Sequence, residues 1–286
     1  MRYEAPDSVE GAVALLSAAT GEVRVLAGGT DLLVQMRADV VDPELIVDIK
    51  KIAETRAVSE EKGGWRIGAA VTGAELKEHA RLKKAWPGVV EAANLIGSTQ
   101  VQGRATLGGN LCNGSPAADS VPALIAAGAG ATLAGPRGRR DLPGEAVMLG
   151  PRKLALRKGE IVVSFILPPR GPRSSDAYLR FIPRTEMDIA VVGAGVSLTL
   201  DGSGTISAAR VSLGAVAARV LLVAEAAQAV IGSRLDEAAQ RRLEAAARAV
   251  CRPIDDKRGT IEFRTDVAAV LTRRAALIAL DRARTS

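Results

Sequence analysis

Two pairs of adjacent glycines, Gly28-Gly29 and Gly108-Gly109, constrain the fold of this chain more than any other feature. Glycine places no side chain between the backbone and a neighbouring group, so the N–H groups of a glycine turn can reach a ligand directly. The two pairs lie far apart in the sequence. We therefore expect two lobes that hold a ligand with two distinct regions between them, and a dinucleotide fits that description.

The first glycine pair follows the apolar run Val23 to Ala27, which is typical of a buried strand. The backbone dipoles of this turn and the hydroxyl of Thr30 suit a diphosphate. The alternative is a tight turn that requires a positive φ. The candidate binding residues of this segment are Ala27, Gly28, Gly29, Thr30, Asp31, Leu32 and Leu33.

The second pair lies in the segment Thr106-Leu107-Gly108-Gly109-Asn110, where a hydroxyl again precedes the glycines and amide side chains follow them. Farther along, Asp119 either caps a helix that starts near Pro122 or binds a hydroxyl of a ribose or ribityl chain, and both roles could hold. Neither pair belongs to a Gly-x-Gly-x-x-Gly or a Gly-x-x-x-x-Gly-Lys-Ser/Thr motif. The fingerprints of the common nicotinamide-binding fold and of the P-loop are therefore missing.

The scarcity of metal ligands limits the chemistry of the chain. Cys112 and Cys251 are its two cysteines and His79 is its one histidine, so the chain alone cannot hold a four-cysteine iron–sulfur cluster or a zinc site. His79 lies in a charged segment that predicts a structural role, and no Ser-His-Asp triad is visible. A ligand-binding chain without groups for bond cleavage indicates a cofactor that brings its own redox chemistry.

The net charge of +6 raises the question of nucleic-acid binding, but the basic residues are dispersed among acids and the aromatic content is 2%. We therefore expect solvated faces, anion contacts or subunit contacts, and no nucleic acid as a partner. The N-terminus lacks the apolar core of a signal peptide, and the longest apolar stretch, Val121 to Gly135, is too short to cross a bilayer. These features predict a cytoplasmic protein without membrane insertion.

The hydrophobic pattern predicts helices and strands along the whole chain. Asp7 or Ser8 caps a first helix, and a parallel crossover joins the strands Val23–Ala27 and Leu45–Ile49. A capping box at Thr72 opens a helix that extends to Arg81. The remaining predicted elements are helices at 89–96, 122–127, 218–231, 236–250 and 266–283, strands at 65–71 and 161–167, a hairpin of 189–200 with 205–213, a glycine-rich connection at 97–114 and a linker at 170–176.

Five motifs occur in the order found in one known family. They are Ala27-Gly28-Gly29-Thr30-Asp31-Leu32, Thr106-Leu107-Gly108-Gly109-Asn110, Ser115-Pro116-Ala117-Ala118-Asp119, Arg184-Thr185-Glu186-Met187-Asp188-Ile189-Ala190 and Asp256-Lys257-Arg258-Gly259-Thr260-Ile261-Glu262-Phe263-Arg264. With them the chain resembles the FAD-binding medium subunit of the molybdenum hydroxylases, which include xanthine dehydrogenases, carbon monoxide dehydrogenases and 4-hydroxybenzoyl-CoA reductases. The resemblance implies an α+β fold: a PCMH-type FAD-binding domain with α/β lobes at residues 1–54 and 55–170, then a C-terminal α+β domain at residues 177–286 with an antiparallel sheet and helices.

The resemblance also assigns roles to individual residues. Residues 27–33 surround the FAD diphosphate, while Thr106 and residues 108–110 hold the pyrophosphate and ribityl region. Asp119 binds a hydroxyl of the cofactor, and Ser115 belongs to the same motif. The other implied cofactor contacts are Ile161 and Val162 at the flavin or adenine, Ile96 where some relatives carry an aromatic flavin neighbour, and Arg180 where relatives often carry a lysine, with a surface arginine as the alternative.

Finally, the resemblance implies partners. A large subunit holds molybdopterin and a small subunit holds two 2Fe-2S clusters, from which electrons pass through FAD to NAD⁺, oxygen or a quinone; two such trimers can pair. Two cysteines exclude the extra cluster of some 4-hydroxybenzoyl-CoA reductase subunits, and Gly-Gly-Thr-Asp differs from the Gly-Gly-His/Gln-Ser of carbon monoxide dehydrogenases. The alternatives are a self-contained FAD-dependent oxidase or reductase and a nucleotide-binding scaffold without a redox role.

Overall fold

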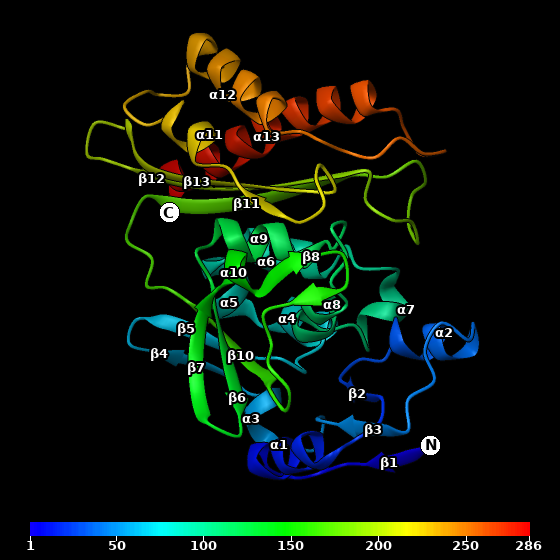
Figure 1. The fold of residues 1–286 in the computed structure, drawn as a ribbon. Coiled ribbons are helices and arrows are strands. Elements are labelled where there is room, and N and C mark those ends of the chain that lie inside the picture. Colours follow the sequence, from blue (N-terminus) through cyan, green and yellow to red (C-terminus); the bar gives the residue numbers. More distant parts are fainter.

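The computed structural model describes residues 1–286. Figure 1 shows an N-terminal sheet, a larger second sheet with short helices around it, and a C-terminal sheet covered by long helices, one above the other. The N-terminal and C-terminal sheets therefore lie at opposite ends of the molecule, with the second sheet between them.

The N-terminal sheet is parallel. Its strands are β1 (Arg2–Glu4), β3 (Leu45–Asp48) and β2 (Val23–Leu26), in that order across the sheet. The middle strand β3 is buried along its whole length, as expected for a parallel strand covered on both faces. The parallel crossover predicted between β2 and β3 is confirmed.

Two helices connect these strands. The first, α1 (Val9–Ala18), is capped by Ser8, whose hydroxyl accepts a hydrogen bond from the N–H of Gly11 at 3.3 Å. The second, α2 (Leu32–Arg37), starts directly after the first glycine pair and joins β2 to β3. Although its sequence begins Leu-Leu-Val, α2 has no buried residue, so its apolar side chains lie on the surface or at a cavity.

The second sheet is antiparallel throughout. Its strands follow the order β4 (Val58–Glu61), β5 (Gly64–Gly68), β10 (Ile161–Leu167), β6 (Gly130–Gly135) and β7 (Gly138–Pro143). The central strand β10 is almost entirely buried, and Phe165 on it belongs to the largest hydrophobic core. The strand predicted at residues 161–167 is confirmed.

Short helices and a two-stranded ribbon complete the second lobe. They are α3 (Ala53–Arg56), α4 (Gly73–Glu78), α5 (Ala80–Ala85), α6 (Pro87–Ala93), α7 (Thr99–Gln102), α8 (Leu107–Cys112), α9 (Ser120–Ala126), α10 (Gly144–Val147), β8 (Met148–Gly150) and β9 (Lys153–Leu154). The predicted capping box is present: the hydroxyl of Thr72 accepts from the N–H of Glu75, and the carboxylate of Glu75 accepts from the N–H of Thr72.

The C-terminal part consists of an antiparallel sheet and three helices. The strands are β11 (Ser174–Phe181), β12 (Val192–Leu200), β13 (Ile206–Gly214) and β14 (Leu221–Leu222), and the helices are α11 (Ala224–Gln228), α12 (Glu237–Ala249) and α13 (Ile261–Thr285). The predicted hairpin at Asp201 is confirmed; its carboxylate accepts the N–H groups of Ser203 and Thr205. Figure 1 shows the helices on one face of this sheet and the second lobe on the other.

Several predicted elements differ from the structure for local reasons. The helix expected to reach Arg81 ends at Glu78, because Nδ1 of His79 accepts the N–H of Leu82 at 3.2 Å and starts α5. The expected linker at 170–176 ends in strand β11, because Asp176 is buried in an ion pair with Arg170 at 2.9 Å.

Two further predictions were too simple, and one hairpin was not predicted. The glycine-rich connection at residues 97–114 contains α7 and α8, and the helix expected at 218–231 is limited to α11. The hairpin of β6 and β7 was not predicted, because β7 is a charged edge strand, Gly-Arg-Arg-Asp-Leu-Pro, without an apolar pattern. None of the helices is both long enough and apolar enough to cross a membrane.

Candidate functional site

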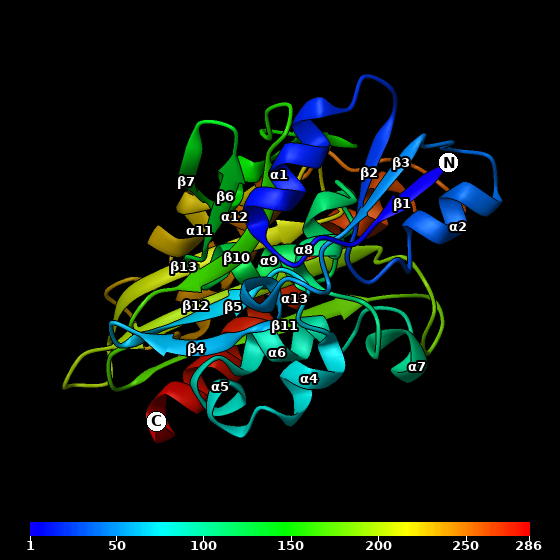
Figure 2. The same cartoon turned by 90° about the horizontal axis from the view of Figure 1, so that it is seen from below.

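A cavity of about 350 Å³ lies between the two lobes and is lined by both glycine pairs. This volume is within the range of roughly 300–1,000 Å³ that small-molecule sites occupy. Figure 2 shows α8 beside the N-terminal sheet, which brings the second glycine pair next to the first. The predicted site residues that line the cavity are Ala27, Gly28, Gly29, Thr30, Asp31, Leu32, Ile96, Thr106, Gly108, Gly109, Asn110, Ile161 and Val162.

The first glycine loop offers a row of free backbone donors. The N–H groups of residues 28–32 make no hydrogen bond within the chain. Gly29 has a φ of +80°, which favours glycine, and it turns the chain from β2 into α2. Consecutive unpaired N–H groups at a helix start bind anions, so this loop can hold a diphosphate.

Gly28 has a second role that the sequence did not show. A Cβ atom on Gly28 would lie 2.0 Å from the carbonyl oxygen of Arg104, just before the second loop. The missing side chain therefore lets the two lobes approach each other, whereas the sequence predicted ligand access or a tight turn for this glycine pair.

The second glycine loop is the start of a helix. Thr106 caps α8: its hydroxyl oxygen accepts the N–H of Gly109 at 2.9 Å, which leaves the hydroxyl proton free to donate. A Cβ on Gly108 would lie 2.5 Å from the carbonyl oxygen of Ala69, so Gly108 allows close packing. A Cβ on Gly109 would meet only the Thr106 hydroxyl, at 3.0 Å, and Gly109 lines the cavity.

Amide side chains join the two lobes at the cavity wall. Nε2 of Gln35 on α2 donates to Oδ1 of Asn113, just after α8, at 2.9 Å. Oδ1 of Asn110 accepts two hydrogen bonds from Ser120. The sequence indicated Asn113 as a possible site residue, since it is one of the amides that follow the glycines. No sequence pattern indicated Gln35.

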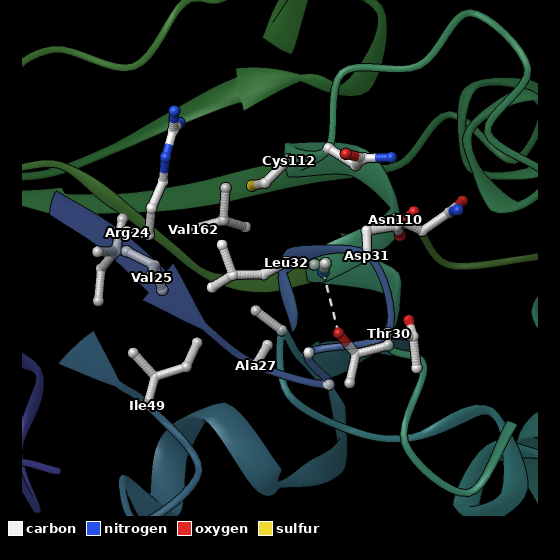
Figure 3. A pocket seen from close by; sticks show the side chains of 18 of the residues that line it. Arg24, Val25, Ala27, Thr30, Asp31, Leu32, Ile49, Asn110, Cys112 and Val162 are labelled. Carbon is white, nitrogen blue, oxygen red and sulfur yellow. Dashed lines mark hydrogen bonds between the residues drawn. The ribbon is translucent and has the colours of Figure 1, made fainter. Parts of the chain in front are cut away.

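One end of the cavity is mostly apolar and the other polar. Figure 3 shows Val25, Ile49 and Val162 at one end, together with Arg24, and Thr30 and Asn110 toward the other. This polarity suits a ligand with an aromatic ring and a polar chain. The lining residues that sequence analysis missed are Val23, Arg24, Val25, Gln35, Val41, Ile49, Ala69, Ala105, Cys112, Asn113, Arg152, Leu154, Leu156 and Glu160.

Charged groups line the cavity as well. Arg152 makes no ion pair with another residue, so its guanidinium is available to an anion. Glu160 is bound by Arg140 at 2.7 Å, and the hydrogen bonds from Arg140 and from the N–H of Arg157 lower its pKa to about 2. Burial raises the pKa of Cys112 to about 12, so its sulfur stays a thiol.

Four predicted site residues lie outside the cavity lining: Leu33, Ser115, Asp119 and Arg180. Leu33 is 53% exposed, and the hydroxyl of Ser115 accepts the N–H of Ala117. Asp119 stands at the N-cap position of α9, as one alternative expected, but its side chain makes no capping hydrogen bond. The Arg180 side chain is only 5% exposed, so the alternative of a surface arginine is wrong.

Asp119 and Arg180 instead form a buried ion pair between α9 and β11. Nη1 of Arg180 donates to Oδ2 of Asp119 at 2.8 Å, and the Tyr178 hydroxyl donates to Oδ1 at 3.2 Å. Burial raises the pKa of Asp119 to about 6, although Arg180 and Tyr178 lower it. The pair joins the second lobe to the C-terminal sheet.

The remaining sequence candidates have structural roles. His79 caps α5 and contacts the ring of Trp65 edge-on, as the structural interpretation predicted. Basic residues of the charged runs form ion pairs, for example Arg139 with Glu54 and Arg273 with Glu244. No group of three His, Cys, Asp or Glu side chains is arranged to hold a metal ion.

The class of protein follows from comparison with known families. Residues 1–170 match the FAD-binding domain of molybdopterin dehydrogenases, and residues 177–279 match the C-terminal domain of the carbon monoxide dehydrogenase flavoprotein. The chain therefore belongs to the FAD-binding medium subunits of the molybdenum hydroxylase family, which are parts of oxidoreductases, and the resemblance stated from the motifs is confirmed.

Individual relatives span nearly the whole chain. The chain is 33% identical to the carbon monoxide dehydrogenase medium chain of Hydrogenophaga pseudoflava, over 96% of this chain and 94% of that one. It is 31% identical to the xanthine dehydrogenase FAD-binding subunit of Escherichia coli O157:H7, over 88% and 87% of the two chains. The structure of a Cu,Mo-carbon monoxide dehydrogenase superimposes with a TM-score of 0.94 at 33% identity, over 99% of this chain and 98% of that one.

The cavity fits the cofactor of this family. FAD requires donors for a diphosphate, room for its chain and an apolar surface for a ring system. The unpaired N–H groups of residues 28–32 supply the donors, and Val162 belongs to the apolar end. A Cβ on Gly109 would reduce the space beside Thr106.

Proposed function

We propose that this chain binds FAD in the cavity between its two lobes and serves as the electron-transfer subunit of a molybdenum-containing complex. When bound, FAD takes up electrons from 2Fe-2S clusters on a partner and passes them to a terminal acceptor such as NAD⁺, oxygen or a quinone. The observation that carries the proposal is the row of unpaired N–H groups in a cavity formed by residues of the segment that matches the FAD-binding domain.

The residues divide the binding task between them. We assign the diphosphate to the N–H groups of residues 28–32, with help from Arg152 and the Thr106 hydroxyl. Ala27 and residues 108–110 form the wall beside the chain of the cofactor. Ile96, Ile161 and Val162 supply apolar surface for its rings and exclude water there.

The four predicted residues outside the lining support the site from behind. Leu33 packs near Gly29, where it lies 3.3 Å from the position of a Cβ, and so backs the turn. Asp119 and Arg180 hold the start of α9, and Ser115 stabilises the turn before it. We propose that these residues act on the cofactor through the chain segments they hold.

The proposal requires partner subunits. The two cysteine thiols, Cys112 and Cys251, are too few for an iron–sulfur cluster, so the clusters belong on another chain. We propose a large molybdopterin-binding subunit and a small 2Fe-2S subunit as partners, and a pairing of two such trimers. Because both cysteines are free thiols, we also propose a cytoplasmic location.

The three larger sheets suggest the division of the chain. We propose domains at residues 1–54, 55–170 and 177–286, each containing most of one of these sheets, with β11 of the last sheet beginning at Ser174. The FAD cavity lies between the first two, and the ion pair of Asp119 with Arg180 joins the last two.

An exposed apolar surface supports the docking of the small subunit near the cavity. Two contacts connect parts of this surface: the N–H of Met187 donates to the carbonyl of Gly97, next to the cavity residue Ile96, and the rings of Phe181 and Phe263 are in contact. Figures 1 and 2 show α2 and α7 on this same side. Exposed apolar patches of this kind mark interfaces, and the exposed side chains are Leu33, Val34, Val40, Met187, Ile189, Ile254, Ile261 and Phe263.

The substrate of the complex belongs to the large subunit. The chain is almost equally identical to subunits of a carbon monoxide dehydrogenase and of a xanthine dehydrogenase, at 33% and 31%. Such similarity across different substrates is expected if this subunit carries only the cofactor.

Purification of the chain together with its natural partners tests this function. We expect two further chains, molybdenum, iron and inorganic sulfide in the complex, and bleaching of the flavin absorbance when substrate is added without oxygen. The chain separated from its partners should show no bleaching with the same substrate. Bleaching of the isolated chain would identify a self-contained flavoenzyme instead.

A further inference from the structure

Asn110 lies at the cavity, and its side-chain oxygen is held by Ser120. Oδ1 of Asn110 accepts the N–H of Ser120 at 3.0 Å and the hydroxyl of Ser120 at 2.7 Å. Ser120 is fully buried, so water does not compete for these two hydrogen bonds.

The backbone N–H of Ser120 identifies which end of the Asn110 amide faces Ser120, and the Ser120 hydroxyl, at 2.7 Å, holds that end in place. The oxygen and nitrogen of an asparagine side chain have nearly the same shape, but a backbone N–H can only donate, so the atom facing it must be the oxygen. Nδ2 of Asn110 then occupies the other position and makes no hydrogen bond within the chain. Since Asn110 lines the cavity, two N–H donors are available to a ligand there.

Ser120 is itself held firmly. It is the first residue of α9, and the preceding residue, Asp119, is bound by Arg180 and Tyr178 of β11. Two residues further on, the carbonyl of Pro122 packs closely against β12, where a Cβ on Gly195 would lie 2.6 Å from it. A residue anchored in this way can fix the orientation of a neighbouring side chain.

We propose that Ser120 is a positioning residue for the cofactor: it orients the Asn110 amide so that Nδ2 donates to an acceptor oxygen of FAD. A phosphate oxygen and a flavin carbonyl share this chemistry. The proposal rests on the proposed function, because it requires FAD to occupy this cavity.

The test compares Ser120→Ala and Asn110→Ala, alone and combined, in the full-length chain. FAD is removed, and dissociation constants are measured by titration with FAD and with ADP. Ser120→Ala keeps the backbone N–H but removes the hydroxyl that holds the Asn110 amide. We expect it to raise the Kd for FAD by roughly 3- to 10-fold, which corresponds to the loss of about one hydrogen bond, and to have no further effect in the Asn110→Ala background. A parallel loss of ADP affinity identifies a phosphate as the acceptor; a loss for FAD alone, with a shifted flavin spectrum, identifies the ring.

Two further variants separate positioning from a general effect on packing. Ser212→Ala removes another fully buried hydroxyl, one that has no hydrogen-bond partner, and it should leave the Kd unchanged. Asn110→Asp keeps an acceptor for Ser120 but loses the donor, and it should weaken FAD binding more than Ser120→Ala.

The outcomes distinguish the positioning role from the function itself. Equal effects of Ser120→Ala in both backgrounds, or wild-type affinity of Asn110→Asp, would overturn the positioning role of Ser120. Failure of the wild-type chain to bind FAD would instead overturn the proposed function.

Discussion

Three glycines of the two loops are required for two different reasons. Gly28 and Gly108 allow close packing of backbone against backbone, since a Cβ on either would collide with a carbonyl oxygen at 2.0 or 2.5 Å. Gly109 keeps space open at the cavity. The sequence identified all three as site residues and predicted ligand access, with a tight turn as the alternative at Gly28, but it did not predict close packing. Gly28 meets Arg104, which is far away in the chain, and no local sequence pattern indicates such a contact. The packing role of these glycines was therefore not predicted.

Substitutions at Gly108 and Gly109 should therefore separate binding from folding. We expect Gly109→Val to abolish FAD binding while the unfolding free energy changes by less than about 1 kcal/mol, because the added atoms enter the cavity. Gly108→Ala should lower the unfolding free energy by about 1–3 kcal/mol, because its Cβ meets the backbone of Ala69. Urea denaturation and flavin absorbance measure the two effects. A Gly109→Val protein that purifies with bound flavin would refute the loop assignment.

At the scale of elements, the hydrophobic pattern correctly predicted several strands and turns that depend on the local sequence. The parallel crossover of β2 and β3, strand β10 and the hairpin of β12 and β13 follow from hydrophobic runs and turn residues. Charged elements whose side chains form ion pairs with other segments were not predicted. The edge strand β7 is one, because Arg140 on it is paired with Glu160.

The pair of Arg140 with Glu160 predicts a pH-dependent contribution to stability. The pKa of Glu160 is lowered to about 2, so its contribution is complete above the ordinary pKa of 4.5 and is lost as the pH falls toward 2. We expect Glu160→Gln to lower the unfolding free energy by about 1–3 kcal/mol at pH 7, and the difference from wild type to shrink as the pH falls from 5 to 3. Urea denaturation across this range measures it. A difference that stays constant over the range would contradict the assignment.

At the scale of the whole molecule, the order of five motifs identified the family and its cofactor, and most of the predicted site residues meet at one cavity. The placement of Asp119 and Arg180 could not be predicted, because Asp119 lies just before α9 and Arg180 lies on β11, and only the packing of these two elements brings them together. The sequence likewise did not indicate an exposed apolar surface on α2, because only the structure shows that this helix has no buried residue.

That apolar surface leads to a prediction about assembly. Val34→Glu places a charge on α2, where Val34 is 64% exposed, so folding should change by less than about 0.5 kcal/mol while co-purification with the iron–sulfur subunit is lost. Leu277→Glu, at an exposed position on α13 away from this surface, is the matched control and should retain the partner. Retention of the partner by Val34→Glu would place the interface elsewhere.

The central claim is that the cavity between the glycine loops holds FAD, and the flavin content of the purified protein tests it most directly. Released cofactor from freshly prepared, partner-bound material should amount to about one FAD per chain, and Gly109→Val material should contain none. Wild-type protein that carries no flavin and takes up none when FAD is added would contradict the account.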